Sequence, residues 1–362
     1  MMNPFINEGN LCSNVSINKL MIYKMPTDKV NQNLQGKSAM DIFSTEKFIY
    51  IIKKYSSELK LNLNEIEEKK LPQYLDKCLQ SSDKEVRKTA EKIVSIFGER
   101  LGVILLTLKK GDKENRIARK DWTDAHWDYW ANGIKSIIFV GGLSSSKIGE
   151  RLKYYIEKVF HDVNEEAYNI ILSSDSANVG IRGCTTYIDE KIENQKYLIF
   201  DFGQTFIKRS IVTFKDDKIF NIESLEKIES KYVVWDFENR NEEMMEALKL
   251  NQYLIDTISD TIKSIDGGAS NIGSHIVISI ANYVRNGAFE DRGGYGKLRL
   301  ISDDYRKFLS DELFNRFDTK LKVTLIHDGT AMASAFSDYP DSVCISLGTV
   351  FGVGFPVCHD NK

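Results

Sequence analysis

Hydrophobic side chains recur every three or four residues in several stretches of the chain, as they do on the buried face of an α-helix. The longest such stretch runs from Val86 to Leu108, and Ser82 with Glu85 predicts a capping box in front of it. Ser44 is expected to cap an earlier helix. The same spacing predicts two further helices, at 241–264 and 303–317.

Runs of β-branched and aromatic residues predict strands in two different arrangements. Residues 137–140 end in a Gly-Gly pair and lead into a helical pattern that reaches residue 160, which is typical of a parallel α/β unit. From residue 197 the predicted strands instead follow one another closely, at 197–202, 206–213, 217–222 and 231–237, with later strands at 275–281 and 322–326. The fold class expected from this pattern is α/β.

Two other stretches carry packing signals. Ala177, Gly180 and Gly183 predict a helix that lies close to its neighbour, because small side chains let two backbones approach. The segment 121–130 holds three tryptophans, which suits a core or a subunit contact because aromatic side chains bury large areas. Stacking of these rings against a ligand is the alternative.

The composition narrows the class of protein. A chain of 362 residues is long for one compact core and suits two domains. The net charge of −3 and the pI of 6.1 argue against long-range attraction to nucleic acid or anionic lipid. The five cysteines are scattered, and neither a leader nor a run of about 18 apolar residues is present. We therefore expect a cytoplasmic protein with no nucleic-acid or membrane partner.

The segment DFGQTFIK, at 201–208, has the features of a phosphate-binding turn. Phosphate oxygens need donors that converge from one side, and backbone N–H groups supply them where a glycine such as Gly203 allows close approach. Thr205 adds a hydroxyl donor, and Gln204 and Lys208 complete the candidate phosphate contacts. Asp201 can hold Mg²⁺ beside the phosphates, usually through water. An ordinary hairpin with a turn glycine is the alternative.

A second glycine turn, GTVFGVG at 348–354, is the other candidate phosphate site. Gly348, Thr349 and Gly352 again expose backbone N–H groups between two predicted strands, although a plain hairpin of small residues has the same pattern.

Asp328 follows an apolar strand that ends at Ile326 and precedes a helix of small residues. An aspartate at the end of a parallel strand can accept a proton from a substrate hydroxyl group. The alternative is a purely structural one, because aspartate is also a favoured N-cap.

The segment FVGGLSSS, at 139–146, follows another predicted strand. Gly141 and Gly142 would let a flat ring lie against the backbone, and Ser144 belongs to the start of the following helix. A generic strand-to-helix turn explains these residues equally well.

Together these four motifs resemble the actin-like ATPase superfamily of sugar kinases, and most closely its ROK branch. The resemblance assigns DFGQT to the first phosphate hairpin, GTVFGVG to the second, HDG to the catalytic-base motif and VGGLSSS to the adenosine turn. It implies a two-lobed, ribonuclease H-like fold with ATP and Mg²⁺ as cofactors. It also implies a small sugar-like acceptor, with Asp328 as the general base.

The order of the motifs differs from that of the family, in which the first phosphate hairpin opens the chain and the adenosine turn comes last. Joining residue 362 to residue 1 restores the family order, so the sequence resembles a circular permutant. On this interpretation one lobe comprises 1–190 and is completed by the hairpin at 342–362. The other lobe comprises 191–341 and carries the first phosphate hairpin and the catalytic aspartate.

Two family motifs are incomplete. The CxCGxxGC zinc loop would fall within 10–40, where Cys12 is the one cysteine, so we expect no structural zinc. The sugar-contacting E-x-G-H motif has only NEGN, at 7–10, as its counterpart, which makes Glu8 a candidate substrate contact and leaves the histidine missing.

The remaining candidate substrate contacts also depart from the family pattern. His327 replaces the asparagine that precedes the catalytic aspartate. The loop at 281–297 lacks the family's proline, yet it is polar and offers Asn282 and Arg285. The acceptor side is therefore less well matched than the phosphate side.

Three functions are compatible with these motifs. The first is an ATP-dependent kinase that phosphorylates a hydroxyl group of a small sugar-like acceptor. The second is a non-catalytic nucleotide or sugar sensor on the same fold, which the weakened acceptor motifs favour and Asp328 argues against. The third is an actin-like ATPase that uses water as its acceptor. The sequence is also compatible with a homodimer.

Overall fold

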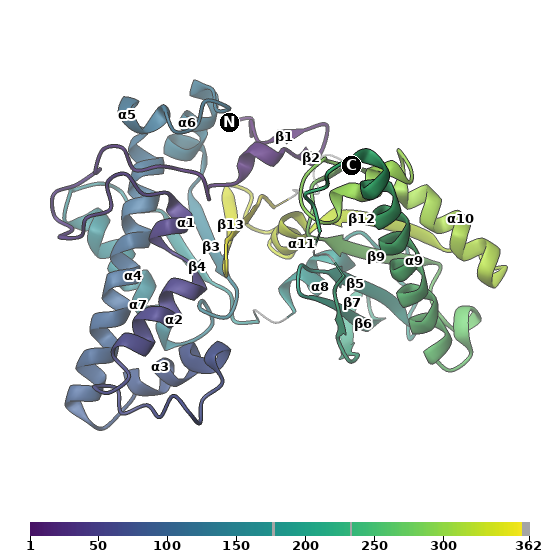
Figure 1. The fold of residues 1–362 in the computed structure, drawn as a ribbon, viewed down its shortest axis with the longest axis horizontal. Helices are drawn as coiled ribbons and strands as arrows, with labels where there is room; N and C mark the ends of the chain where they lie inside the picture. The colour runs from purple at the N-terminus through teal and green to yellow at the C-terminus, as the bar shows by residue number, and fades with distance from the viewer. Residues whose placement is uncertain (176–177, 232–233, 357–362) are drawn as a thin grey trace. The chain divides into compact units, whose positions relative to one another are not determined.

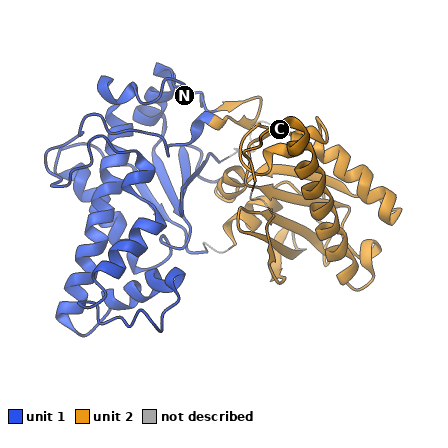
Figure 2. Ribbon diagram, in the orientation of Figure 1, with its two compact units in different colours: residues 1–5, 14–177, 338–356 blue, residues 6–13, 178–337, 357–362 orange. Residues whose placement is uncertain are grey.

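The computed structural model describes residues 1–175, 178–231 and 234–356, which form a mixed α/β protein of two compact units (Figures 1 and 2). Among the described residues, unit 1 contains 1–5, 14–175 and 338–356, and unit 2 contains 6–13, 178–231 and 234–337. The sequence predicts that all of 1–190 belongs to one lobe, whereas residues 6–13 and 178–190 lie in unit 2.

Unit 1 is built on a four-stranded sheet of order β14-β13-β3-β4. Strands β13 and β14 form an antiparallel hairpin, while β13, β3 and β4 run parallel. Its strands are β3 (Ser136–Val140), β4 (Asn169–Leu172), β13 (Ser342–Leu347) and β14 (Phe351–Gly354). Its helices are α1 (Ala39–Ile42), α2 (Thr45–Lys54), α3 (Leu71–Leu79), α4 (Lys84–Lys110), α5 (Lys113–Arg116), α6 (Asp124–Asp128) and α7 (Lys147–His161), with short turns of helix at 68–70 and 129–133.

Unit 2 is built on a sheet of order β12-β9-β5-β6-β7, in which β8 also pairs with β6. Strands β5, β9 and β12 run parallel, and β6 and β7 continue the sheet antiparallel to their neighbours. The strands of the sheet are β5 (Tyr197–Phe202), β6 (Phe206–Lys215), β7 (Lys218–Ser224), β8 (Ile228–Glu229), β9 (His275–Ile280) and β12 (Lys322–His327). Its helices are α8 (Val179–Thr185), α9 (Arg240–Ser264), α10 (Tyr305–Phe317) and α11 (Asp328–Ser334), with 3₁₀ turns at 268–271 and 296–300. Two small hairpins complete it, β1 (Ile6–Asn7) with β2 (Asn10–Leu11), and β10 (Val284–Arg285) with β11 (Ala288–Phe289).

The two sheets share one arrangement of strands. In unit 2 the hairpin β5-β6 lies beside two parallel strands, β9 and then β12. In unit 1 the hairpin β13-β14 lies beside two parallel strands, β3 and then β4. The hairpin comes first along the chain in unit 2 but last in unit 1. The two units therefore repeat one sheet pattern with the order of the chain exchanged.

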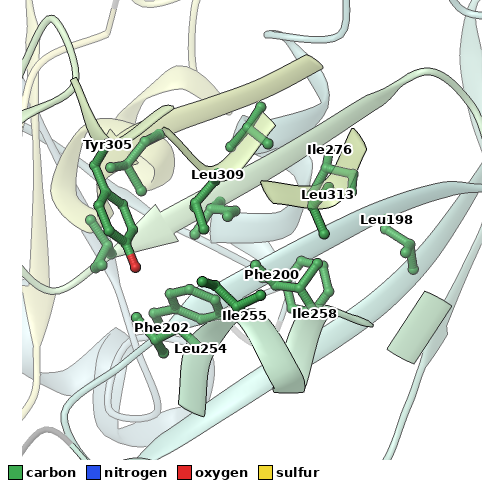
Figure 3. Close-up of a cluster of buried hydrophobic side chains, with 14 of the residues drawn as sticks. Leu198, Phe200, Phe202, Leu254, Ile255, Ile258, Ile276, Tyr305, Leu309 and Leu313 are labelled. Carbon is green, nitrogen blue, oxygen red and sulfur yellow. The ribbon is translucent and has the colours of Figure 1, made fainter. Parts of the chain in front are cut away.

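Strand β5 separates two hydrophobic layers of unit 2, because successive side chains of a strand point to opposite faces. Leu198, Phe200 and Phe202 pack with the apolar side chains of α9 and α10, as Figure 3 shows. Tyr197 and Ile199 pack on the other face with residues of α8 and α11. Asp201 has the parity of the second set, so its side chain belongs to the face that α8 and α11 cover.

The predicted close packing of the small-residue helix is confirmed at one glycine. A Cβ atom on Gly183 of α8 would lie 1.6 Å from the carbonyl oxygen of Ala331 in α11, so only glycine fits there without movement. Gly180 faces open space, and residue 177 lies outside the described residues. The close contact fixes α8 against the helix that begins with Asp328.

The tryptophan segment of unit 1 is part of the core, as predicted. Trp122, Trp127 and Trp130 are 7%, 2% and 0% exposed, and the rings of Trp122 and Trp127 meet edge to face at 5.0 Å. These rings are buried against protein, which leaves no free ring face for the alternative of ligand stacking at this place in unit 1.

Helix ends show where the sequence predictions were right and wrong. Ser44 caps α2 by accepting from the N–H of Lys47, as predicted. The predicted capping box of Ser82 and Glu85 is wrong, because Asp83 is the N-cap of α4 and accepts from Glu85 and Val86. A side chain one residue closer to the helix reaches the free N–H groups better.

The predicted strand at 231–237 is also wrong. Residues 232–233 lie outside the described residues, and residues 231 and 234–237 are not in a strand; the short β8 lies just before them. The other predicted strands and the helices at 241–264 and 303–317 are present, with shifts of up to two residues at their ends. None of the helices in the described ranges is long and apolar enough to cross a membrane.

Candidate functional site

Three polar side chains of unit 2 gather on the α11 face of its sheet. Asp201 on β5 is paired in register with Lys208 on β6 and with Ser279 on β9. Because paired residues of neighbouring strands point to the same face, these side chains meet without help from any loop. They lie near the carboxyl ends of the parallel strands β5 and β9, where open α/β sheets usually bind ligands.

Asp201 is the centre of this group. Its Oδ1 accepts from the hydroxyl of Ser279 at 2.9 Å, and its Oδ2 accepts from Nζ of Lys208 at 2.8 Å. The carboxylate of Asp201 raises the pKa of Lys208, to which Asp328 adds a smaller effect. The two acids therefore stabilise the positive charge of Lys208, and its side chain is 60% exposed.

Asp328 begins α11, directly after the last residue of β12. His327 holds the N-cap position, so the alternative that Asp328 is the N-cap is wrong. One oxygen of Asp328, Oδ1, accepts from the N–H of Gly329 at 2.7 Å and lies 3.1 Å from Nε2 of His327. The side chain of Asp328 is 40% exposed, so solvent or a ligand reaches it.

The surroundings of Asp328 favour its neutral form. Although 40% of the side chain is exposed, the protein atoms around the carboxyl group exclude enough water to raise its pKa to about 7, and the negative charge of Asp201 contributes to the rise. The Gly329 N–H group and the Lys208 ammonium act in the opposite direction. A carboxyl group with a pKa near neutrality can take up and release a proton at physiological pH.

His327 is a buried, uncharged neighbour of Asp328. Its ring is stacked on Tyr283 at 4.2 Å, and burial together with Arg292 lowers the pKa of His327 to about 3. The residue is 9% exposed, and within the described part of the chain its Nδ1 has no hydrogen-bond partner. His327 thus places an uncharged, buried imidazole ring beside the carboxyl group of Asp328.

Asn282, at the end of β9, is also buried, with 4% exposure. Its amide nitrogen donates to the carbonyl oxygens of Glu290 and Arg292, which ties the start of the polar loop at 281–297 to its middle. Its Oδ1 is buried without a partner among the described residues. Asn282 therefore has a clear structural role as well as one unused acceptor.

The turn between β5 and β6 differs from expectation in how it uses its glycine. The N–H of Gly203 donates to the carbonyl oxygens of Asp201 and Phe206, so this donor is used inside the turn. A Cβ atom at Gly203 would lie 2.9 Å from the Phe206 oxygen, which explains the glycine. Gln204 and Thr205 are exposed and remain the accessible residues of the turn.

Glu8 and Arg285 are not gathered with these groups. Glu8 is exposed in the turn between β1 and β2 with a φ of 49°, and Arg285 is exposed on β10. The three residues after Glu8 line a cavity of 200 Å³ in unit 2 together with Arg306, His327 and Thr330, among others. The β1-β2 hairpin thus reaches this cavity through residues that sequence analysis did not select.

The candidate residues of unit 1 meet at the carboxyl edge of its own sheet. Gly348 and Thr349 form the turn between β13 and β14, and the N–H of Gly352 donates to Oγ of Ser346 at 3.0 Å. Gly141 follows β3 with a φ of 98°, and a Cβ there would lie 2.9 Å from the carbonyl oxygen of Leu347. The glycine turn after β3 therefore packs directly against the start of the β13-β14 turn.

Gly142 and Ser144 have different surroundings in that turn. A Cβ at Gly142 would meet no atom within 4 Å, so the backbone there is open to a ligand. Ser144 is 1% exposed, and its hydroxyl donates to the carbonyl oxygen of Gly141 at 2.8 Å. Ser144 thus stabilises the conformation of the turn, whereas Gly142 leaves the backbone of the turn accessible to a ligand.

The donor set of unit 2 suits a metal ion only when a ligand brings further oxygens. The described residues contain no group of three or more His, Cys, Asp or Glu side chains suited to a metal. Mg²⁺ needs one or two carboxylates when phosphates and water complete its shell. Asp201 and Asp328, which interact electrostatically, meet that smaller requirement. Asp201 would act through water, because both of its oxygens already accept hydrogen bonds.

Sequence reasoning missed three residues of this site. Ser279 is a hydroxyl within the apolar run HIVISI, and that break in the pattern could have indicated it. Tyr283, which stacks on His327, and Tyr295, which donates to Gly203, lie in the polar loop. Their roles follow from tertiary contacts that no local pattern predicts.

No protein-family model matches this chain, and no curated protein matches it.

Proposed function

We propose that the protein is an ATP-dependent kinase that transfers the γ-phosphate to a hydroxyl group of a small sugar-like acceptor. The observation that carries this proposal is the Asp328 carboxyl group, with its pKa near 7, in electrostatic contact with Asp201 and Lys208. A carboxylate of this kind suits a general base. The accompanying acid and ammonium suit the charge of a magnesium-bound phosphate chain.

The fold supports the same proposal through its repeated sheet. A hairpin beside two parallel strands occurs in both units, as two ribonuclease H-like lobes of an actin-like kinase would require. In unit 1 the hairpin comes last in the chain, as a circular permutation would produce. The rings of Phe5 and Phe355 are stacked at 5.5 Å, so the two ends of the described chain meet within unit 1. Close ends of this kind make a permuted chain feasible.

The chemical step uses Asp328 as the proton acceptor. The acceptor hydroxyl oxygen forms a bond to the γ-phosphorus while the bond from that phosphorus to the ADP oxygen breaks. The hydroxyl proton passes to the Asp328 carboxylate, whose Oδ1 already accepts from Gly329. Lys208 balances negative charge near Asp201 and the phosphates. Mg²⁺, when bound, would neutralise charge on the phosphate oxygens.

A non-catalytic nucleotide sensor is the second candidate, and a specific observation favours it. Both oxygens of Asp201 and the N–H of Gly203 are already engaged within unit 2, which leaves fewer groups for a phosphate. A sensor would bind nucleotide without turnover. The exposed carboxyl group of Asp328 and its raised pKa favour the kinase.

The kinase proposal is tested with Asp328→Asn, which keeps the shape of the side chain and removes the base. We expect phosphotransfer to fall about 10²- to 10⁴-fold, the usual contribution of general-base catalysis. Nucleotide affinity should change little. A variant with near-normal turnover would show that Asp328 is not the base.

A further inference from the structure

Two buried hydroxyl groups form a chain of hydrogen bonds that ends on the turn at 203–205. Oη of Tyr295 donates to the carbonyl oxygen of Gly203 at 3.0 Å, and Oγ of Ser230 lies 2.9 Å from Oη. A carbonyl oxygen can only accept, so the tyrosine proton points to Gly203 and the Ser230 hydroxyl must donate to Tyr295. Tyr295 is 0% and Ser230 is 5% exposed, which shields both bonds from water.

The same turn is held at a second point. The backbone N–H of Ser230 donates to the carbonyl oxygen of Thr205 at 2.9 Å. The carbonyl groups of Gly203 and Thr205 therefore both point into unit 2. In a trans peptide the C=O and N–H groups point in opposite directions, so the N–H of Gln204 points away from Tyr295. Gln204 is an exposed residue, so a ligand can approach the turn at this position.

We infer that Tyr295 and Ser230 are positioning residues for phosphate binding. They hold the Gly203–Gln204 peptide in the orientation that offers the Gln204 N–H to a phosphate group. This inference rests on the proposed function, in which the turn binds the phosphates of ATP. Tyr295 belongs to the polar loop at 281–297, so the loop proposed to face the acceptor also sets the conformation of the phosphate turn.

The experiment compares Tyr295→Phe with Tyr305→Phe, which is a closely matched control. Both tyrosines are 0% exposed in one hydrophobic cluster, and the hydroxyl of Tyr305 donates to Oδ1 of Asn251 at 2.7 Å instead of to the turn. Each variant loses one buried hydroxyl group and keeps its ring. Affinity for MgATP is measured on the full chain by titration calorimetry, at a temperature where both variants are folded.

We expect Tyr295→Phe to weaken MgATP binding about fivefold, the equivalent of one net hydrogen bond. Ser230→Ala, which keeps the backbone N–H, should weaken binding less. Tyr305→Phe should bind MgATP as the parent does, although it loses similar stability. Equal affinities of Tyr295→Phe and Tyr305→Phe would overturn the inference.

A second measurement separates this inference from the proposed function. Hydrogen exchange of the Gly203 amide, which is bonded inside the turn, reports whether the turn is held. We expect faster exchange in Tyr295→Phe and no change in Tyr305→Phe, whether or not nucleotide binds. If the parent binds no MgATP, the proposed phosphate site is wrong. The exchange rates then still show whether the hydrogen bond from Tyr295 holds the turn in place. An unchanged exchange rate in Tyr295→Phe would show that Tyr295 does not hold the turn.

Discussion

Asp328 carries the proposed chemistry, and its environment is a balance of opposing effects. Burial and the charge of Asp201 raise the pKa of its carboxyl group, while Gly329 and Lys208 limit the rise. A base held near neutrality needs both sets of contacts, because burial alone would keep it protonated and solvation alone would make it weak. The residues that supply this balance come from two strands and one helix of unit 2.

The raised pKa predicts how stability depends on pH. The pKa of Asp328 rises from 3.8 in the unfolded chain to about 7 in the folded protein. Between these values the folded state holds a proton that the unfolded chain has released, so stability falls as pH rises and the full cost is present above about pH 7. Asp328→Asn removes this cost. We expect the variant to melt at a higher temperature than the parent at about pH 8.

The comparison at low pH is the control for that prediction. At a pH well below 3.8 the carboxyl group is protonated in both states, so the difference in melting temperature should vanish. A difference of the same size at both pH values would show that packing, and not ionisation, distinguishes the two proteins.

Single residues were predictable from sequence where a turn or a strand end marked them. Asp201 and Asp328 stand at such boundaries, one or two residues before glycines that a local pattern can reveal. Tyr295 and Ser279 were not predictable in the same way, because their partners are 92 and 78 residues away along the chain. Their importance depends on which strands pair, which only the fold determines.

At the scale of elements, the contact between α8 and α11 fixes the position of Asp328. Gly183 lets α8 approach so closely that an added Cβ would overlap the carbonyl oxygen of Ala331. The small residues of the helix predicted this packing, although they could not identify the partner. The error at the start of α4 arose because serine and aspartate are both favoured N-cap residues. The error at 231–237 arose because strand propensity depends strongly on the tertiary context.

Gly183→Ala should destabilise unit 2, because either α8 or α11 must move to admit the methyl group. We expect a loss of about 1–3 kcal/mol in the free energy of unfolding, the usual cost of overpacking, together with reduced turnover. Chemical denaturation measures the first effect.

Gly180→Ala is the matched control on the same helix. A Cβ at Gly180 meets no atom within 4 Å, and alanine is a better helix former than glycine. This variant should be as stable as the parent or slightly more stable. Equal losses from both substitutions would contradict the packing account.

At the scale of the whole molecule, the most informative feature is the strand pattern that the two sheets share. Unit 1 and unit 2 repeat one pattern of hairpin and parallel strands, and the order of the chain through that pattern is exchanged in unit 1. Phe5 and Phe355 stack on each other, and the N–H of Phe351 donates to Asn18, so the N-terminal segment packs on the last strand of unit 1. These contacts are compatible with the proposed circular permutation, which requires the two ends of the chain to lie close together.

A chain with the order restored tests this interpretation. Residue 362 would be joined to residue 1 by a short glycine-rich linker, and new ends would be opened in the exposed segment at 189–194. We expect the rearranged protein to fold with a circular dichroism spectrum and an unfolding midpoint close to those of the parent, because the packing of both sheets is unchanged. Failure to fold, with a parent that folds well, would argue against permutation.

The most direct test of the proposed kinase is ADP release from MgATP in the presence and absence of a panel of sugars. A kinase with Asp328 as its base releases ADP much faster with one class of sugar, and the released ADP matches the phosphorylated sugar formed. Release that is independent of every sugar would indicate an ATPase. Binding of nucleotide with no release under any condition would contradict the kinase proposal and support a sensor.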